Sequence, residues 1–282
     1  KKTIFVIEAS SYQLEYSKIF SSKYAMILNI SVDHIERHRN LKNYVNAKFK
    51  LLDSQKKNCV AFVKKNDDLI KKKLNSKNFR SKIIKVDTKK SNSFFKDIKN
   101  EYFLTETNKE NLAFIFEISK KLKLKNNLLL KTINKFKGLN YRQQIILKKK
   151  NLIVINDSKS TSFASSIGTL KNNQNIYWII GGIHKKGDKL NLPKKYFKKI
   201  KAFVFGKDKK FFNNELKGKI VYENFTNLEF AFKKIIKLIK KDRSPERTIL
   251  FSPSAASFDS FKNFEERGLY FNKLSKKYLN GI

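Results

Sequence analysis

Leu152-Ile-Val-Ile-Asn-Asp-Ser-Lys-Ser-Thr161 is the stretch that decides the fold, because four apolar residues run directly into a polar cluster. The short apolar run is typical of a buried strand. The amphipathic segment 161–171 that follows predicts a helix. A buried strand that turns directly into a helix is the repeating unit of a parallel α/β sheet, so this stretch predicts that class of fold.

The same alternation continues toward the C-terminus. Further strands are predicted at 176–180, 202–205, 219–222 and 248–251, and further helices at 227–241 and 257–279. This order of strands and helices predicts a doubly wound sheet. The alternation becomes regular after Gly138, so residues 139–282 are predicted to form one domain.

The part of the chain before Gly138 also predicts an α/β domain with a largely parallel sheet. Buried strands are predicted at 3–7, 24–31 and 59–63, and helices at 12–20, 41–53 and 108–123. The polar, Lys-rich segment 64–105 predicts no clear element.

Polar or small residues follow nearly every predicted strand. They are Glu8, Asp33, His34, Asp157, Lys159, Thr161, Gly181, Gly182, Lys185, Ser252, Ser254 and Ser257. Ligands of doubly wound sheets bind beyond the carboxyl ends of the strands, so these residues are candidates for a site. The helix start after Asn156 favours an anion such as phosphate or carboxylate. Ordinary capping by Asp157 or Ser158 explains one polar residue there, but not Lys159 beside it.

Two features bear on metal and nucleotide binding. Glu8 and His34 could bind Mg²⁺ or Mn²⁺, although an N-cap carboxylate and a surface histidine explain them as well. His34 and His38 have a spacing that can hold zinc on a helix, but no third ligand is evident and the segment reads as a loop. Gly182–Asp188 nearly matches a phosphate-binding P-loop, but Asp188 stands where lysine is needed.

Composition narrows the class of protein. The net charge is +39 over 282 residues, which favours nucleic-acid binding, but the basic residues are scattered and mostly Lys, as in compositional drift. No apolar run reaches the roughly 18–20 residues of a membrane span. The single cysteine, Cys59, favours a reducing, cytoplasmic setting. The only methionine is Met26, so we expect the numbered chain to be a fragment.

Four separated segments are less generic than the rest. They are Glu8-Ala-Ser-Ser-Tyr-Gln-Leu-Glu15, Leu28-Asn-Ile-Ser-Val-Asp-His34 with Ala47-Lys48, Asn156-Asp-Ser-Lys-Ser-Thr161, and Ser252-Pro-Ser-Ala-Ala-Ser-Phe-Asp-Ser-Phe-Lys-Asn-Phe-Glu-Glu-Arg-Gly268. In this order and spacing they resemble the Mur ligase family. The last segment resembles most the members of that family that add D-glutamate.

The resemblance implies three domains in a complete member, of which this chain holds two. Residues 1–138 would be a partial central ATPase domain without its P-loop, and 139–282 a Rossmann-like C-terminal domain. The implied reaction joins D-glutamate to UDP-N-acetylmuramoyl-L-alanine with ATP and Mg²⁺, through an acyl phosphate, in peptidoglycan synthesis. The implied protein is a cytoplasmic monomer with small-molecule substrates, no membrane attachment and no specific nucleic-acid partner, and this chain alone is expected to be inactive.

The resemblance also implies residue roles. Glu8 and His34 would bind Mg²⁺, and Lys48, carbamylated by CO₂, would support a second Mg²⁺. These three residues and Arg142, which would reach the ATP phosphates, form the implied catalytic set. Implied ATP contacts are Asn108, Asn111, Arg142 and Asp157. Implied D-glutamate contacts are Lys159, Thr161, Lys185, Ser257 and Phe264, while Asp33, Ser10 and Gln13 would support the metal and phosphate site.

Some positions depart from the family pattern. Thr107 and Tyr141 stand where histidine is usual, and Ile183 and His184 where acidic or small residues are common. These departures bear on the geometry of the nucleotide and amino-acid sites. A ligase of the same family with another amino acid or with folate is the nearer alternative, and a basic nucleic-acid-binding module is the more distant one.

Overall fold

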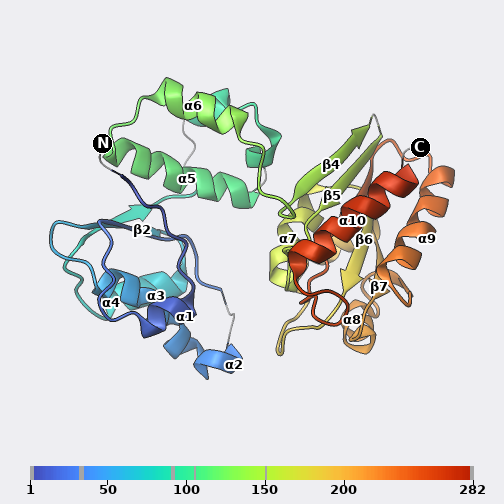
Figure 1. The fold of residues 1–282 in the computed structure, drawn as a ribbon, viewed down its shortest axis with the longest axis horizontal. Coiled ribbons are helices and arrows are strands. Elements are labelled where there is room, and N and C mark those ends of the chain that lie inside the picture. Colours follow the sequence, from blue (N-terminus) through green and yellow to red (C-terminus); the bar gives the residue numbers. More distant parts are fainter. Residues whose placement is uncertain (1–2, 32–34, 90–92, 105, 150, 280–282) are drawn as a thin grey trace. The chain divides into compact units, whose positions relative to one another are not determined.

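The chain forms two compact units, residues 1–136 and 137–282. A computed structural model describes residues 3–31, 35–89, 93–104, 106–149 and 151–279 (Figure 1). Each unit has its own β-sheet and its own apolar core. Within the described ranges, no helix combines the length and the apolar character that a membrane span requires.

The first unit is built on a three-stranded parallel sheet in the order β1-β2-β3. The strands are β1 (Tyr24–Ile27), β2 (Val60–Lys64) and β3 (Lys82–Val86). Helices α3 (Leu41–Asp53) and α4 (Asp68–Asn75) pack on one face, and α5 (Glu106–Lys121) packs on the other. Both faces of the central strand β2 are therefore buried, which explains its continuous apolar run.

The remaining elements of the first unit are short or lie at its margin. They are α1 (Ser11–Tyr16), α2 (Ile35–His38), two 3₁₀ helices (Ser93–Asp97 and Glu101–Leu104) and α6 (Asn126–Lys135). The 3₁₀ helices, α5 and α6 share a small apolar core around Phe103 and Leu112. Of this layer, only the two 3₁₀ helices lie within 64–105, the segment whose sequence predicts no clear element, while α5 corresponds to the helix predicted at 108–123.

The strand predicted at 3–7 is wrong. The structure assigns no strand to residues 3–10, and Ile4, Phe5, Val6 and Ile7 are 62% to 95% exposed. An apolar run becomes a buried strand only beside a neighbour that satisfies its backbone groups and covers its side chains. In the described part of the chain, no strand pairs with this segment.

The second unit contains a six-stranded sheet in the order β4-β5-β9-β6-β7-β8. Its strands are β4 (Gln144–Lys149), β5 (Leu152–Asn156), β6 (Ile176–Gly181), β7 (Ile200–Phe205), β8 (Val221–Asn224) and β9 (Arg247–Phe251). Strand β4 pairs antiparallel with β5, and all other pairs are parallel. The five parallel strands therefore end at one edge of the sheet.

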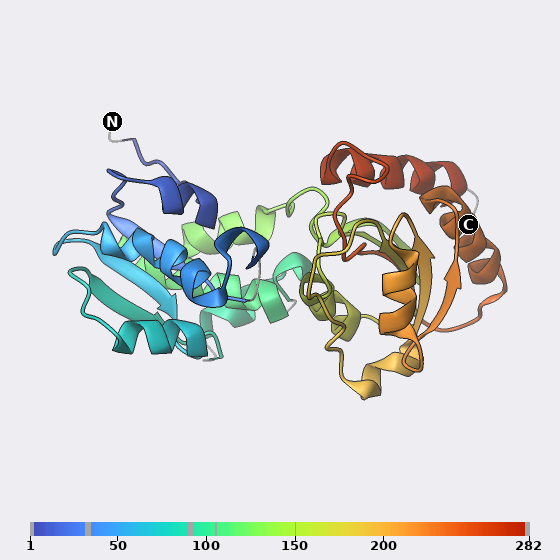
Figure 2. The ribbon, with the colours of Figure 1, turned by 90° about the horizontal axis from the view of Figure 1, so that it is seen from below.

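Helices cover both faces of this sheet (Figures 1 and 2). Helices α9 (Leu228–Lys241) and α10 (Phe264–Leu279) pack on one face, and α7 (Phe163–Asn172) and α8 (Lys209–Leu216) on the other. Phe251 of β9 stacks on Phe271 of α10 with ring centroids 4.5 Å apart. The predicted doubly wound α/β architecture is confirmed.

The helix predicted at 257–279 starts later, at Phe264. The carbonyl of Ser257 accepts hydrogen bonds from the backbone N–H groups of Ser260 and Phe261, which closes a local turn. The side chain of Asn263 then accepts the N–H of Glu266 at 2.8 Å, and a helix can begin after such a cap. Residues 252–263 thus form a loop at the edge of the sheet instead of the first turns of α10.

Gly181 ends β6 where only glycine fits. Its φ is +138°, and a Cβ added there would lie 1.9 Å from the carbonyl oxygen of Phe205 on the paired strand β7. Gly218 also has a positive φ, +71°, but an added Cβ would meet no atom within 4 Å. Alanine substitution at Gly218 would therefore introduce backbone strain alone, whereas alanine at Gly181 would introduce backbone strain and a steric collision.

We expect Gly181→Ala to destabilise the second unit far more than Gly218→Ala. A backbone with positive φ disfavours alanine by about 1–2 kcal/mol, and this is the loss of stability expected for Gly218→Ala. The collision at Gly181 should raise the loss to roughly 3 kcal/mol or more, because a paired backbone cannot shift freely. Urea unfolding followed by fluorescence of Trp178, the single tryptophan, reports on this unit. Equal losses in the two variants would contradict the close approach at Gly181.

Candidate functional site

Three of the predicted polar segments meet at one edge of the second sheet. Strand β9 lies between β5 and β6, so the residues that follow these strands are neighbours. The N–H of Asp157 donates to Phe251 at 2.7 Å, and the N–H of Gly181 donates to Pro253 at 3.0 Å. Ile183 and Ala256 exchange two backbone hydrogen bonds of 3.0 and 2.8 Å. The ends of the strands are thus held together by backbone pairing beyond the sheet itself.

Buried hydroxyl groups connect this edge to α7. Ser166 of α7 lies 2.7 Å from Ser252 and 2.6 Å from Ser254, measured between Oγ atoms. Its Oγ is also 2.7 Å from that of Ser160. All four side chains are buried, so each hydroxyl needs a partner inside the protein. The hydroxyls of Ser252 and Ser254 therefore serve this internal network.

Asp157 is buried beside the same network. Its carboxylate accepts a hydrogen bond from Ser252 Oγ at 2.8 Å and from the N–H of Gln143 at 3.0 Å. Burial raises the pKa of Asp157 to about 7, and the hydrogen bonds and the nearby charge of Arg142 only partly offset this effect. The protonated form of the Asp157 carboxyl group is therefore favoured relative to that of an exposed aspartate.

Lys159 and Phe264, two predicted D-glutamate contacts, lie together. The Lys159 ammonium is 3.8 Å from the centroid of the Phe264 ring, within cation–π range. The backbone N–H of Lys159 donates to Tyr141 at 3.0 Å, which fixes the turn. Thr161, the other predicted contact on the segment of Lys159, is half-buried and precedes Ser162, the N-cap of α7.

Lys185 lies on the loop that follows β6. Asp188 closes the loop by accepting the N–H of Phe163, the first residue of α7, at 2.8 Å. Asp208 accepts hydrogen bonds from the backbone N–H of His184 at 3.0 Å and contacts its ring Nδ1 at 2.7 Å. Lys185 is thus half-exposed between two anchored neighbours. Ser257, on the loop after β9, is buried.

Arg142 precedes β4 and lies near Asp157, whose pKa its charge lowers. The neighbouring Tyr141, which departs from the family pattern, packs against α10, because a Cβ added to Gly268 would lie 2.4 Å from its ring. Tyr141 and Gln143 both have positive φ angles, 62° and 47°. The segment that carries Arg142 is therefore strained and held at both sides.

Asn108 and Asn111 lie on α5 of the first unit. Asn108 is buried, and its amide nitrogen donates to the carbonyl of Tyr102 at 2.7 Å. Asn111 is half-buried on the next turn. Asn108 thus joins α5 to the preceding 3₁₀ helix, in addition to any role toward a nucleotide.

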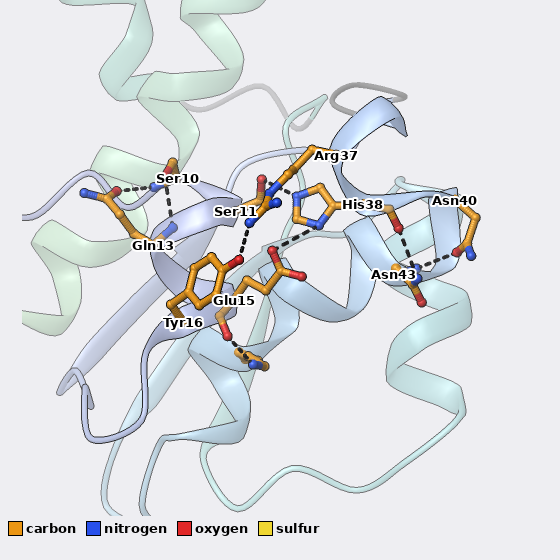
Figure 3. Close-up of polar contacts among 10 residues, drawn as sticks. Ser10, Ser11, Gln13, Glu15, Tyr16, Arg37, His38, Asn40 and Asn43 are labelled. Atoms are coloured by element: carbon orange, nitrogen blue, oxygen red, sulfur yellow. Dashed lines mark hydrogen bonds and ion pairs between the residues drawn. The ribbon is translucent and has the colours of Figure 1, made fainter.

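A polar cluster joins α1 to α2 in the first unit (Figure 3). The ring Nε2 of His38 is 2.9 Å from Ser11 Oγ, and its Nδ1 is 3.8 Å from a carboxylate oxygen of Glu15. Tyr12 stacks on the buried His38 ring at 5.5 Å. Ser10 and Gln13, predicted to support the metal site, form the capping box of α1. Across the described ranges, no three His, Cys, Asp or Glu side chains are placed to hold a metal ion.

The predicted Mg²⁺ ligands are only partly described. Glu8 lies exposed in the segment before α1, and Lys48 is half-buried on α3, 5.2 Å from the centroid of the Tyr44 ring. Asp33 and His34 lie outside the described residues. The carboxylate oxygens of Glu8 are a donor type that suits Mg²⁺, and the metal site stays a prediction.

Sequence reasoning assigned no role to several buried polar residues at the sheet edge. Asn156 donates from its amide to the carbonyl of Gly268 at 2.8 Å and to Asn272 Oδ1 at 2.7 Å. Arg267 and Ser166 are likewise buried and hydrogen-bonded. Asn156 and Arg267 stand in segments that carry the family resemblance, and Ser166 stands in a predicted helix, but none of these signals indicates the contacts that the side chains make.

Comparison with known proteins places these features in a family context. Residues 1–134 match the Mur ligase middle domain. The chain is 35% identical over 293 residues to the UDP-N-acetylmuramoylalanine–D-glutamate ligase of Rickettsia prowazekii (strain Madrid E). This match covers 97% of this chain and 65% of that protein. It is 30% identical over 336 residues to the same ligase of Rickettsia conorii (strain ATCC VR-613 / Malish 7), covering 96% and 67%. The chain thus spans about two thirds of the length of these curated relatives.

The fold is also similar to that of a solved ligase. The MurF ligase of Thermotoga maritima in complex with ADP matches with a TM-score of 0.64, over 91% of this chain and 63% of that one. The sequence identity is 15%, so this likeness concerns the fold alone.

The pKa of Asp157 predicts a pH-dependent stability of the second unit. In the unfolded chain the pKa returns to 3.8, so between about pH 4 and pH 7 the folded state binds more protons than the unfolded state. Stability should therefore fall as pH rises through this range, by at most roughly 1.4 kcal/mol per pH unit. In Asp157→Asn this contribution should be absent. We would measure the free energy of urea unfolding of the parent protein and of Asp157→Asn at pH 5 and pH 8 by Trp178 fluorescence. If the difference in unfolding free energy between the two proteins were the same at both pH values, the raised pKa would be contradicted.

Proposed function

The chain belongs to the Mur ligase family, and on this premise we propose that it is part of an ATP-dependent ligase that joins D-glutamate to UDP-N-acetylmuramoyl-L-alanine in peptidoglycan synthesis. The observation that carries the proposal is the meeting of three polar loops at one edge of the second sheet. These loops contain Lys159, Lys185 and Ser257. A ligand with two carboxylates is matched by such a set of ammonium and hydroxyl groups.

The residues proposed for D-glutamate differ in what they offer. Lys159 and Lys185 supply ammonium groups, and Ser257 supplies a hydroxyl. Thr161 lies just before α7, where the helix start favours a carboxylate. Phe264 holds the Lys159 ammonium against its ring, which limits the positions that this charge can take. Together these groups favour a small dianion over a neutral amino acid.

Other residues are proposed to contact ATP and Mg²⁺. Asn108, Asn111, Arg142 and Asp157 are proposed nucleotide contacts. A protonated Asp157 can donate a hydrogen bond to a ribose hydroxyl, whereas the ionised form can only accept one. Glu8, His34 and carbamylated Lys48 are the proposed Mg²⁺ site. Bound Mg²⁺ would lower the repulsion between the phosphate chain and the attacking carboxylate.

The proposed reaction has two steps. The alanine carboxylate of the UDP-linked substrate attacks the γ-phosphorus of ATP, which forms an acyl phosphate and releases ADP. The amine of D-glutamate then attacks the acyl carbon, and collapse of the adduct releases phosphate and leaves an amide. The proposed role of Arg142 is a forked hydrogen bond to phosphate oxygen, and that of Lys159 and Lys185 is to orient D-glutamate.

The setting of the enzyme is part of the same proposal. All proposed partners are small molecules, and we propose a monomer in the cytoplasm. A lone, buried cysteine, Cys59, agrees with a reducing compartment.

The first test is phosphate release by the complete gene product that contains this chain. With UDP-N-acetylmuramoyl-L-alanine, ATP and Mg²⁺, we expect release to require D-glutamate. L-Glutamate and meso-diaminopimelate serve as controls for the identity of the amino acid. Release with either control amino acid instead of D-glutamate would assign another ligase of the family, and no release from a folded protein that binds ATP would reject the proposed activity.

The second test concerns Lys185. We expect Lys185→Ala to raise the KM for D-glutamate by roughly 10- to 100-fold, because a charge-assisted hydrogen bond contributes about 1.5–3 kcal/mol. Lys186→Ala is the matched control, since it removes the same charge from the adjacent, exposed position. The KM for ATP should stay the same in both variants. An unchanged KM for D-glutamate in Lys185→Ala would remove Lys185 from the proposed pocket.

A further inference from the structure

Arg267 is the fourth residue of α10 and is 1% exposed. Its Nε donates to Ser158 Oγ at 3.1 Å, and its Nη2 donates to the backbone carbonyls of Ser158 at 2.8 Å and Ala255 at 2.9 Å. Ser158 belongs to the turn after β5, and Ala255 belongs to the loop after β9. One guanidinium group therefore bridges two of the three loops at the sheet edge.

This buried charge is only partly compensated by the groups around it in the part of the chain that the structure describes. The charge of Asp259, on the loop after β9, partly offsets the effect of burial on the pKa of Arg267, and Nη1 has no hydrogen-bond partner. Burial lowers the pKa of Arg267 to about 10, so the group stays positive at neutral pH. A buried charge that is only partly compensated is unfavourable for stability, and apolar residues often replace buried ionic groups without loss.

Anchoring of α10 does not account for the arginine. Phe271, Leu274 and Leu279 already bury the apolar face of the helix in the core of the second unit. Asn156 adds a hydrogen bond to the carbonyl of Gly268 at 2.8 Å. The helix is thus held on the sheet by contacts that do not involve the guanidinium.

The residues that Arg267 contacts lie close in the sequence to residues proposed to bind D-glutamate. Ser158, which the guanidinium contacts twice, is directly followed by Lys159. Ser158 Oγ also donates to the carbonyl of Phe264, whose ring lies 3.8 Å from the Lys159 ammonium. Ala255 precedes Ser257 by two residues on the other loop.

We propose that Arg267 is a positioning residue for the D-glutamate pocket: its guanidinium fixes the turn that carries Lys159 relative to the loop that carries Ser257. The proposal rests on the function proposed above. The fork shape is needed because two carbonyls and one hydroxyl must be contacted from one side chain. The positive charge acts in the same sense as Lys159 and Lys185, since all three favour an anionic ligand at this edge.

The test uses the complete gene product with Arg267→Met, Arg267→Lys and, as a matched control, Lys273→Met. Lys273 is exposed on the same helix, so its variant loses one positive charge without touching the loops. For each protein we would measure kcat, the KM for D-glutamate and the KM for ATP, and follow unfolding by Trp178 fluorescence.

We expect Arg267→Met to raise the KM for D-glutamate by roughly tenfold or more while the KM for ATP stays within about twofold. Arg267→Lys keeps the charge but loses the fork, so its KM for D-glutamate should lie between those of Arg267→Met and the parent protein. Lys273→Met should behave as the parent. A merely structural role would shift unfolding and both KM values together.

Several outcomes would overturn the proposal. One is a parental KM for D-glutamate in folded Arg267→Met, and another is an equal rise of both KM values. If Arg267→Met does not fold, Arg267→Lys decides, and a parental KM for D-glutamate in that variant rejects the positioning role. A parent protein without D-glutamate-dependent release would reject the proposed function itself, and the role of Arg267 with it.

Discussion

β9 pairs in parallel with β5 on one side and with β6 on the other, and the candidate site of the second unit depends on this arrangement. The three strands come from distant parts of the sequence, but the parallel direction brings their carboxyl ends to one edge. The backbone hydrogen bonds from Asp157 to Phe251 and from Gly181 to Pro253 extend the pairing past the last strand residues. The loops that follow therefore start from fixed positions, which is a condition for any precise polar site.

Many polar groups at this edge are buried, so they need hydrogen-bond partners within the protein. Ser252, Ser254 and Ser166 satisfy one another, and Ser252 also donates to Asp157. Burial of these groups is tolerated because each has a partner, whereas a missing partner would be unfavourable by about 1–3 kcal/mol. Hydroxyls that the sequence offers as ligand contacts thus become structural, and the ammonium groups of the half-exposed Lys159 and Lys185 stay closer to solvent.

The strands of the second unit could be predicted from the sequence because buried parallel strands are continuous apolar runs, as in Leu152–Asn156. The same reasoning failed at 3–7, where the apolar run has no described neighbour, and at 257–263, where phenylalanines three residues apart imitate a helix. The positions of Lys159 and Lys185 followed from the rule on strand ends. The contacts of Arg267 with Ser158 and of Ser166 with Ser252 span 109 and 86 residues, and no local pattern carries such distances.

The net charge of +39 has a bearing on how a site of this kind selects its ligand. A surface rich in lysine attracts every anion. Dissolved salt screens this attraction at distances beyond about 10 Å. Long-range charge can therefore speed the encounter with each of the proposed anionic substrates, but it cannot distinguish among them. Discrimination has to come from short-range geometry. Lys159 against Phe264 and the Arg267 fork are such geometry, because each holds one positive charge to a narrow set of positions at the sheet edge.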